Sequence, residues 1–494
     1  EAGFLYLAAT HLATLTLFAH FSLLGVAAGS LAFPAAGSLV QQETITAALF
    51  ITALIGFGIK AGIMPLHVWL PTAHASAPSH ISAMMSGLLI KSGIYGIFRF
   101  ISFFHEVPAW WGVTLIATGA ISALTGVVFA LAQHDLKRLL AYHSIENIGI
   151  IFMGLGTGVI GLSLGNLTLM VLGTGGALLH TLNHALFKGL LFLSAGSVIH
   201  ATGSRQIDRL GGLGRQMPLT AFFFLLGAVA ISGLPPLNGF ISELLIYLGL
   251  FSGLQGNGTT SLSAMALSIP ILAMVGGLAI TCFIKVHGVV FLGHPRYNSH
   301  GEDPTFPMLM AMTLLALPCL MIGVLPQPVV ALLGPAIANV VPVTADQIRE
   351  AITPLGQLLI PTVIFVALGI TIFILFRLSS PRKRETEETW SCGYLTPTPR
   401  MQYTASSFAA TLVDIFRSIL RPHQRHPHLA PFFPDRQRHR SHQPETVLDY
   451  LFMPLLRVIE QQSSWLRRLQ HGQLHLYILY IFATVLILLA WSHG

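Results

Sequence analysis

Long apolar runs recur along this chain and restrict its fold more than any other feature. Most are about 20 residues long, which is enough to cross a hydrocarbon core of ~30 Å. Lipid offers the backbone no hydrogen-bond partners, and no segment shows the ten-residue alternation of a barrel strand, so helices are expected. The sequence predicts an all-α polytopic membrane protein with about eleven spans, at residues 3–29, 46–66, 80–103, 110–132, 141–164, 167–199, 219–250, 262–292, 306–335, 356–377 and 476–492.

The amino-acid composition excludes a soluble globular enzyme. Hydrophobic residues make up 53% of the chain and charged residues only 9%, whereas a soluble domain has roughly 25% charged residues. The cysteines Cys282, Cys319 and Cys392 are far apart and form no CxxC pair. They cannot ligate an iron–sulfur cluster or a zinc ion, so we expect no cofactor and no metal in this chain.

Basic residues mark every second loop. They follow the fourth, sixth, eighth and tenth spans, at 137–138, 205–215, 296 and 382–384. The positive-inside rule places this side of the protein in the cytoplasm. The net charge of +7 is concentrated between residues 377 and 468. It is therefore a property of the tail, and we expect no nucleic-acid partner.

The tail from 379 to 475 is polar, and its Arg-, His- and Pro-rich part, 421–444, is expected to be a disordered connector. Its flanks differ, because 406–420 and 448–469 carry apolar residues at i, i+3, i+4 and i+7 with arginine on the other face. Both patterns predict amphipathic helices along the cytoplasmic surface. A last span at 476–491 would anchor them.

Ionisable side chains inside the spans are the candidate functional residues, since each costs ~2.5–3.5 kcal/mol in lipid. His180, His184 and Lys188 recur every four residues, which places two imidazoles and an ammonium on one helical face. Such a face should line a hydrated or protein-filled interior. The expected proton-relay residues are Lys60, Lys91, His180, His184, Lys188 and Glu243, with Lys285 and His11 as possible additions.

Helix-breaking residues accompany two of these charges. Pro65 follows Lys60, and Pro235 and Pro236 precede Glu243. Both helices are expected to be interrupted at membrane depth, where transporters commonly bind ions. The two segments also resemble each other, which indicates an internal repeat.

Lysine, histidine and glutamate buried together can exchange protons at accessible pH, so the pattern predicts a proton relay. Hydroxyl and amide side chains such as Ser86, Ser92, Thr181 and Asn183 would bridge its members together with water.

Structural alternatives stay open for several of these residues. Lys60 and Glu243 could form one ion pair, and Lys188 and Lys285 could extend to the membrane surface. Glu146 is interpreted as a helix-start carboxylate that faces the helix dipole. Structural, hydrogen-bonded histidines are expected at the span ends and loops, at His11, His20, His67, His74 and His80.

Motifs in both halves resemble the antiporter-like membrane subunits of the respiratory complex I superfamily. The first half carries KAGIMPLHVWLPTAH at 60–74 and APSHISAMMSGLLIK at 77–91. The second half carries similar signatures at 135–149, 184–188 and 233–243. The resemblance covers roughly residues 1–330.

Within that superfamily the chain is most similar to the hydrogenase-4 and formate hydrogenlyase membrane subunits. The residues that carry this resemblance are ENIG at 146–149, HATG at 200–203, WSCG at 390–393 and PRMQYTASSF at 399–408.

The resemblance implies two inverted five-helix repeats, each with one broken helix. Lys60 would be the broken-helix lysine of the first repeat and Lys91 its connecting lysine. His184 and Lys188 would form the central relay of the second repeat, and Glu243 its terminal group. The helix at 448–469 would be a lateral arm that contacts a neighbouring subunit.

One expected partner is missing. The family pairs the lysine at position 60 with a glutamate on an earlier helix, and Glu1 does not match that motif. The chain begins without Met and without a signal peptide, so we expect a fragment that lacks its start. The expected regions are the rest of the first repeat (1–108), the second repeat (109–292), additional membrane helices (293–378), a cytoplasmic polar segment with the lateral helix (379–475) and a membrane anchor (476–494).

The preferred function is a proton-translocating subunit of a hydrogenase-4/formate hydrogenlyase-type complex, without an active site of its own. A nickel–iron centre and iron–sulfur clusters are expected in partner subunits of a peripheral arm, in a bacterial-type inner membrane. Two alternatives remain: a cation/proton antiporter or NADH-quinone oxidoreductase subunit, and a passive membrane scaffold for a hydrogenase. A quinone-reducing enzyme has no support in the sequence.

Overall fold

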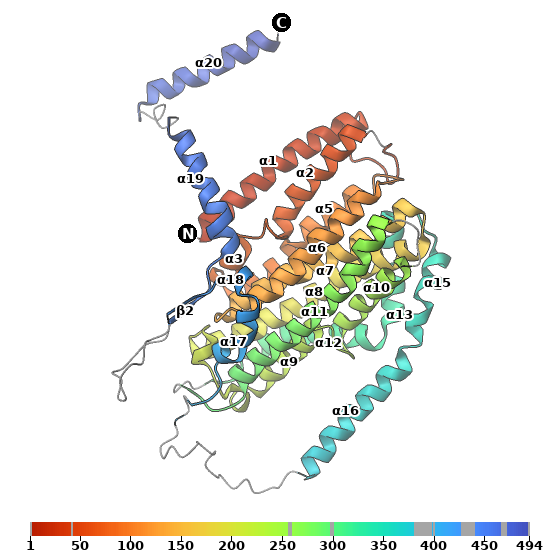
Figure 1. Ribbon diagram of the computed structural model, residues 1–494, viewed down its shortest axis with the longest axis vertical. Helices are drawn as coiled ribbons and strands as arrows, with labels where there is room; N and C mark the ends of the chain where they lie inside the picture. Colours follow the sequence, from red (N-terminus) through yellow and green to blue (C-terminus); the bar gives the residue numbers. More distant parts are fainter. Residues whose placement is uncertain are drawn as a thin grey trace. The chain divides into compact units, whose positions relative to one another are not determined.

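The computed structural model is largely helical, as the sequence predicts (Figure 1). It describes residues 2–40, 43–254, 259–296, 301–379, 398, 401–425, 440–465 and 472–492. The chain forms two compact units, Glu1–Leu420 and Arg421–Gly494. Two earlier expectations, the basic cluster at 382–384 and the motif at 390–393, lie outside the described residues, as do the connector 426–439 and residues 466–471.

Ten helical segments in the described part of the chain are long and apolar enough to cross a membrane. The all-α membrane fold is therefore confirmed. The first of them are α1 (Ala2–Ala28), α2 (Glu43–Ala61), the continuous run of α4 (Ser79–Met84), η1 (Met85–Leu89) and α5 (Lys91–Ile101), α6 (Ala109–Leu131), α7 (Leu136–Leu164) and α8 (Leu167–Thr202). The others are α11 (Thr259–Phe291), α12 (Phe306–Val324), α15 (Ala345–Gly356) with α16 (Leu359–Ser379), and α20 (Leu474–Ser492).

Two of the expected spans differ from the prediction. The run at 219–250 is divided into α9 (Pro218–Ile231) and α10 (Asn238–Gly253). The run at 306–335 ends its long helix at Val324, and two short helices follow, α13 (Pro326–Leu332) and α14 (Gly334–Val340). Prolines at the starts of these short helices explain the interruption, because proline cannot donate a backbone hydrogen bond.

The two helix interruptions have similar local geometry. After α2, Gly62 has a φ of +78°, and Pro65 lies in the connection to α3 (Leu70–Ser76). After α9, Gly233 has a φ of +62°, and Pro235 and Pro236 lead into α10. A positive φ favours glycine, so the sequence ends each helix at a defined residue.

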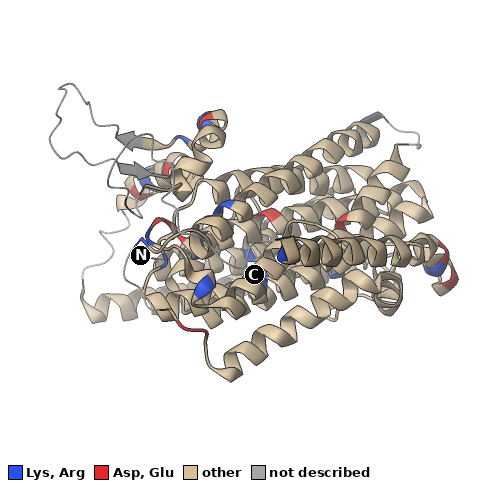
Figure 2. Ribbon diagram, turned by 90° about the horizontal axis from the view of Figure 1, so that it is seen from below, with Lys and Arg blue, Asp and Glu red and all other residues tan. Residues whose placement is uncertain are grey.

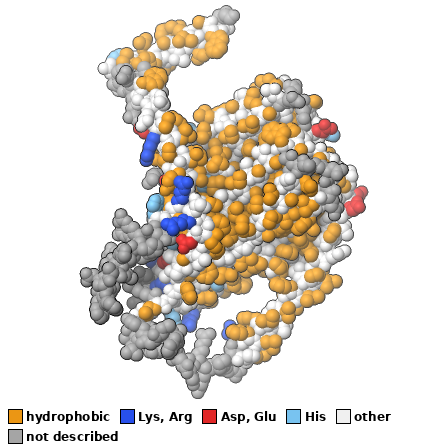
Figure 3. Space-filling view, in the orientation of Figure 1, with side chains coloured by type: hydrophobic (Ala, Val, Ile, Leu, Met, Phe, Trp, Pro, Cys, Tyr) orange, Lys and Arg blue, Asp and Glu red, His pale blue; other side chains and the backbone are white. Residues whose placement is uncertain are grey.

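The centre of the larger unit is formed by α6, α7 and α8, and α7 packs against each of the other two. Small residues allow this packing: a Cβ atom at Gly126 of α6 would lie 2.6 Å from the backbone nitrogen of Glu146 in α7. Such close approach is typical of membrane helix interfaces. Hydrophobic side chains cover most of the face shown in Figure 3, as expected for a surface that lipid solvates. Charged residues are sparse among the helices (Figure 2).

The basic loops lie together at one end of the bundle. The backbone nitrogen of Leu136 donates to Arg205 O, and that of Gly212 donates to Leu292 O, both at 2.9 Å. The guanidinium of Arg296 donates to the carbonyl of Leu210. The loops after α6, α8 and α11 therefore share one side, which the positive-inside rule assigns to the cytoplasm.

The predicted amphipathic segment at 406–420 forms α17 (Ala405–Ile415) and α18 (Arg417–Leu420). A capping box of Thr404 and Ser407 begins α17. In the smaller unit, β1 (His423–Arg425) pairs antiparallel with β2 (Arg440–His442), so these parts of the expected disordered connector are ordered strands. The second amphipathic segment forms η4 (Leu448–Phe452) and α19 (Met453–Gln462).

Candidate functional site

Titratable side chains from four helices gather in the interior of the larger unit. Buried ionisable groups are costly in a membrane protein, so a group of them indicates a function. We call Lys91, His143, Glu146, His180, His184, Lys188 and Glu243 the central cluster; Lys91 is partly buried and the others are buried.

Lys91 and His184 connect the two halves of the chain. The Lys91 ammonium donates to Nδ1 of His184 at 2.8 Å and also to the carbonyl of Ser86. Lys91 lies two positions after the end of η1, a π-helical turn of the kind often found at functional sites. The hydroxyls of Ser86 and Ser144 hydrogen-bond at 2.8 Å, so α7 joins this contact.

Lys188 is fully buried in α8. Its ammonium donates to the carbonyl of Leu140 and lies 5.5 Å from the centre of the Phe192 ring. Glu146 is its electrostatic neighbour. The alternative that Lys188 extends to the membrane surface is therefore wrong.

The structure corrects the interpretation of Glu146. The helix α7 begins at Leu136, and Asp135 caps it by accepting from the backbone nitrogens of Lys137 and Arg138. Glu146 lies about three turns further on, is only 1% exposed, and accepts a hydrogen bond from Nδ1 of His143. It is a member of the central cluster and not a helix-start carboxylate.

His180 connects α7, α8 and the broken helix α10. Its Nε2 lies 3.1 Å from Oδ1 of Asn147, and its Nδ1 lies 2.8 Å from the hydroxyl of Ser242. Asn147 donates its own amide to the carbonyl of His143, so its oxygen is left to accept from His180.

Glu243 begins the second turn of α10, behind the interruption. Its carboxylate lies against Gly233: a Cβ atom added there would be 2.5 Å from Oε2. The preceding residue, Ser242, contacts His180, which places this turn of α10 beside the central cluster.

Lys60 and His11 are not part of the central cluster. Both side chains are exposed, Lys60 at the end of α2 and His11 on α1, where Nδ1 lies 2.8 Å from Leu7 O. The alternative of a Lys60–Glu243 ion pair is wrong, because Glu243 is buried against Gly233 while Lys60 is exposed.

Lys285 is buried in α11, with 2% of its surface exposed. Its ammonium donates to the carbonyls of Leu131 at 2.6 Å and Gln133 at 3.3 Å, at the end of α6. Lys285 therefore points into the protein and does not extend to the membrane surface.

A further buried histidine, His74, lies beside the cluster. His74 was expected to be a hydrogen-bonded structural residue, but neither ring nitrogen has a hydrogen-bond partner. Its ring stacks on Phe192 with the centroids 5.4 Å apart, and Lys188 and Lys137 are electrostatic neighbours. His20 does fit the structural expectation, since Nδ1 contacts Leu49 O and the Thr52 hydroxyl.

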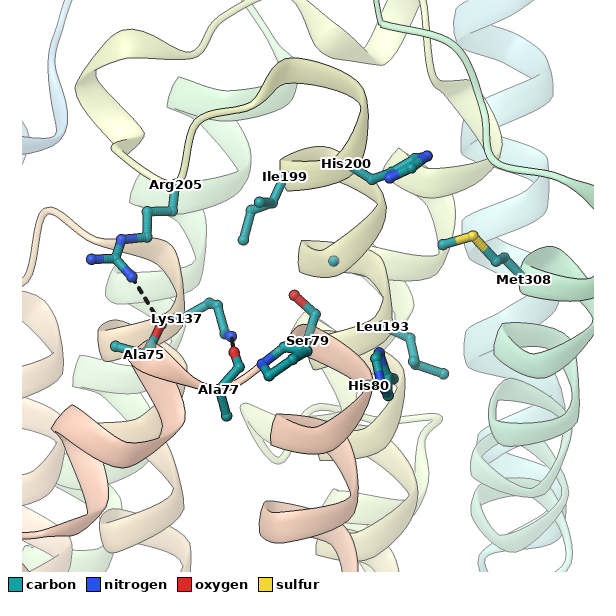
Figure 4. Close-up of a pocket in the computed structure, with 12 residues that line it drawn as sticks. Ala75, Ala77, Ser79, His80, Lys137, Leu193, Ile199, His200, Arg205 and Met308 are labelled. Atoms are coloured by element: carbon teal, nitrogen blue, oxygen red, sulfur yellow. Dashed lines mark hydrogen bonds between the residues drawn. The ribbon is translucent and has the colours of Figure 1, made fainter. Parts of the chain in front are cut away.

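A cavity of about 420 Å³ lies on the basic side, lined by Ala75, Ala77 and His80 among others (Figure 4). Lys137 lines it and donates to the carbonyl of Ala77, and Arg205 donates to Ala75 O at 2.8 Å. Arg205 also pairs with Asp135 at 2.6 Å. His74, His143 and Lys137 were not among the expected relay residues, although all three lie close in sequence to charged or proline-rich motifs.

These features define a class: an all-α multi-pass membrane protein with two interrupted helices and a buried chain of titratable groups, as in ion-translocating subunits. Among the described residues, no group of three or more His, Cys, Asp or Glu side chains could hold a metal ion.

The family profile described as "NADH:quinone oxidoreductase/Mrp antiporter, TM" matches residues 1–269. The chain is 36% identical to hydrogenase-4 component B of Escherichia coli over 99% of its own length and 75% of that protein. It is 38% identical to formate hydrogenlyase subunit 3 of the same organism, over 85% and 69% of the two chains. The chain therefore belongs to the antiporter-like membrane-subunit family that contains both proteins.

A solved structure shares the fold. A chain of the membrane-bound sulfane sulfur reductase, an archaeal respiratory membrane complex, superposes with a TM-score of 0.73 at 24% identity. The match covers 99% of this chain and 76% of that one.

Proposed function

We propose that this chain is the proton-translocating membrane subunit of a hydrogenase-4/formate hydrogenlyase-type complex. The observation that carries the proposal is the central cluster, which joins α5, α7, α8 and α10 inside a membrane protein. Lysine, histidine and glutamate side chains in contact can pass protons along such a path. Their positions in both halves of the chain agree with a relay that runs through the protein.

The contact between Lys91 and His184 has a direct chemical consequence. At an effective dielectric constant of about 20, two positive charges about 4 Å apart repel by ~4 kcal/mol. The two nitrogens lie 2.8 Å apart, so the pair carries one positive charge, on either Lys91 or His184, and not two. A proton that reaches one member must displace the proton of the other, which is the elementary step of a relay.

Lys188, Glu146 and His143 extend this path within the second half. A proton added near Lys188 changes the charge that Glu146 and His143 experience, because these buried groups are screened weakly. Charge changes at one end of the cluster therefore alter proton affinity at the other end. This property would couple the membrane path to redox chemistry in a partner subunit.

The partners of the chain follow from the names of its relatives. We propose that it assembles with other membrane subunits and with a peripheral hydrogenase or dehydrogenase arm, in a bacterial-type inner membrane. The nickel–iron centre and iron–sulfur clusters would belong to that arm. The role of Lys60 as the broken-helix lysine of a first repeat is part of the same proposal.

The test uses the assembled complex in inverted membrane vesicles. We expect Lys188→Met and Glu243→Gln to lower the number of protons moved per electron while the peripheral redox activity persists. Arg349→Gln, which removes an exposed charge on α15, is the matched control and should leave the ratio unchanged. Mass spectrometry of the purified complex identifies the peripheral subunits.

Other outcomes would contradict the proposal in different ways. Unchanged proton yield in both variants indicates a passive scaffold. Flux that requires sodium ions and persists without a redox donor indicates a cation/proton antiporter subunit. NADH-binding partners would keep the proton path but replace the hydrogenase.

A further inference from the structure

We propose that Lys285 and the cavity beside it form a cytoplasmic proton-access site. Residues 401–408, which include the first residues of α17, cover this site and are called the cover below. The inference rests on the proposed proton relay and adds the place where that relay meets water on the basic side. Three observations carry it: the position of Lys285, a chain of contacts that leads inward, and a cover fastened at two points.

Backbone carbonyls at the end of α6 stabilise the buried ammonium of Lys285 in place of a carboxylate. The last carbonyls of α6 have no partners within their helix, and this end of a helix carries partial negative charge. Lys285 donates to one of them, Leu131 O, and also to Gln133 O in the loop that follows the helix. An ammonium has three donors, so one is left for the space that Lys285 lines.

That space is a cavity of about 570 Å³. A water molecule occupies ~30 Å³ in the liquid, so the cavity can hold a chain of several waters. Arg296 and the tail residues Gln402, Tyr403 and Ser407 also line it. These groups come from the basic loops and the tail, so the cavity faces the cytoplasmic side of the bundle.

From Lys285 a series of neighbours leads inward to the central cluster. The ring of His143 stacks on Phe283, which precedes Lys285 by two positions on α11, with the centroids 4.6 Å apart. His143 donates to Glu146 through Nδ1, and Glu146 neighbours Lys188. The other ring nitrogen of His143, Nε2, is buried and has no hydrogen-bond partner. A free ring nitrogen at this point is available to receive or release a proton.

The cover over the cavity is fastened at two points. On one side, Arg296 donates to Tyr403 O at 2.6 Å, and Gln402 exchanges two hydrogen bonds with the backbone of His294. On the other side, Asp208 accepts from the backbone nitrogen of Ala405 at 2.7 Å and from the Ser406 hydroxyl at 3.0 Å.

The cover therefore connects the tail to proton access. Gln402, Tyr403, Ser407 and Phe408 line the cavity, and the tail continues into the second unit of the chain. A subunit that pulls on the tail would change how water reaches Lys285.

The decisive variants are Lys285→Met and Lys285→Arg, assayed in the complete complex in vesicles. Arginine keeps the positive charge and can cap the carbonyls of α6, but it does not release its proton. A positioned proton-transfer group typically contributes ~10²–10⁴-fold to rate. We expect both variants to slow proton translocation by at least about 10-fold, with the peripheral redox activity retained.

Rescue by arginine would overturn the inference, because it would show that Lys285 only caps α6. Lys188→Met in the same assay separates the two proposals. If Lys188→Met stops translocation while Lys285→Arg matches the parent, the relay stands and this access site is wrong. If Lys188→Met also matches the parent, the proposed function itself fails.

A second experiment probes the cavity without touching Lys285. In a Cys392→Ser background, Ser407→Cys places a thiol in the cavity lining, and Ser418→Cys places one on the exposed surface of α18. A bulky, membrane-impermeant thiol reagent should slow proton translocation in the Ser407→Cys protein only. Equal rates before and after labelling at position 407 would contradict access through this cavity.

Discussion

Asp208 offers the sharpest test of the link between the tail and the membrane helices. Its carboxylate uses both oxygens: Oδ1 accepts from the backbone of Ala405, and Oδ2 accepts from Ser406 and pairs with His134 at 3.5 Å. Asp208→Asn keeps one acceptor and removes the other together with the charge. A hydrogen bond to a charged group contributes ~1.5–3 kcal/mol, and about a third of this side chain is exposed. We therefore expect the docking of α17 to weaken by about 1–2 kcal/mol, or roughly 5–30-fold in the opening equilibrium.

Hydrogen–deuterium exchange measures this opening directly. Backbone amides in α17 should exchange roughly 5–30-fold faster in Asp208→Asn than in the parent. Asp303→Asn is the matched control, because Asp303 fastens the start of α9 in the same way, through the backbone nitrogens of Leu219 and Thr220. Its effect should be confined to α9. Unchanged exchange in α17 of the Asp208 variant would refute the reasoning.

The pH dependence of the same contact has a defined sign. Burial alone would raise the pKa of Asp208, but hydrogen bonds from His134, Ser406 and Ala405 outweigh it and hold the pKa below the ordinary value of 3.8. A carboxyl group with a lowered pKa stabilises the folded state above its unfolded pKa, and the contribution is lost as the pH falls through the folded value. Exchange in α17 should therefore show no contribution from Asp208 titration between pH 5 and 8.

Three further variants test the central cluster. Gly233→Ala and Gly203→Ala share a positive φ that costs ~1–2 kcal/mol with alanine, but only the first places a Cβ atom against a carboxylate, so only it should also lower proton translocation. Glu146→Gln removes a buried group that can take up and release a proton, and a positioned group of this kind contributes ~10²–10⁴-fold to rate. Translocation should therefore fall by at least about 100-fold, whereas Glu350→Gln on the exposed face of α15 should match the parent. Asn147→Leu leaves a buried ring nitrogen without its acceptor and should destabilise the purified protein by ~1–3 kcal/mol in thermal unfolding; an unchanged stability would contradict the assigned hydrogen bond.

The candidate site could be predicted only in part. The spacing of His180, His184 and Lys188 was sufficient to predict a buried polar site. Three such groups on one face of an apolar membrane helix must point into the protein, because lipid cannot solvate them. Glu146 was misassigned, because the sequence shows that it lies near a basic loop but does not show at which residue the helix after that loop begins. The true start is Leu136, and the intervening turns bury Glu146 against α6.

The sequence by itself determined the membrane class, most of the spans and the positions of the two helix interruptions. Hydropathy and proline determine the length and the interruption of a single helix, so they can be interpreted without knowing which helices pack beside it. The tertiary structure decided which charges meet. It brought Lys91 to His184 across 93 positions of sequence and Lys285 to the end of α6, and it left Lys60 at the surface. Helical periodicity gives the face on which a side chain lies, but only the packing of helices decides what that face contacts.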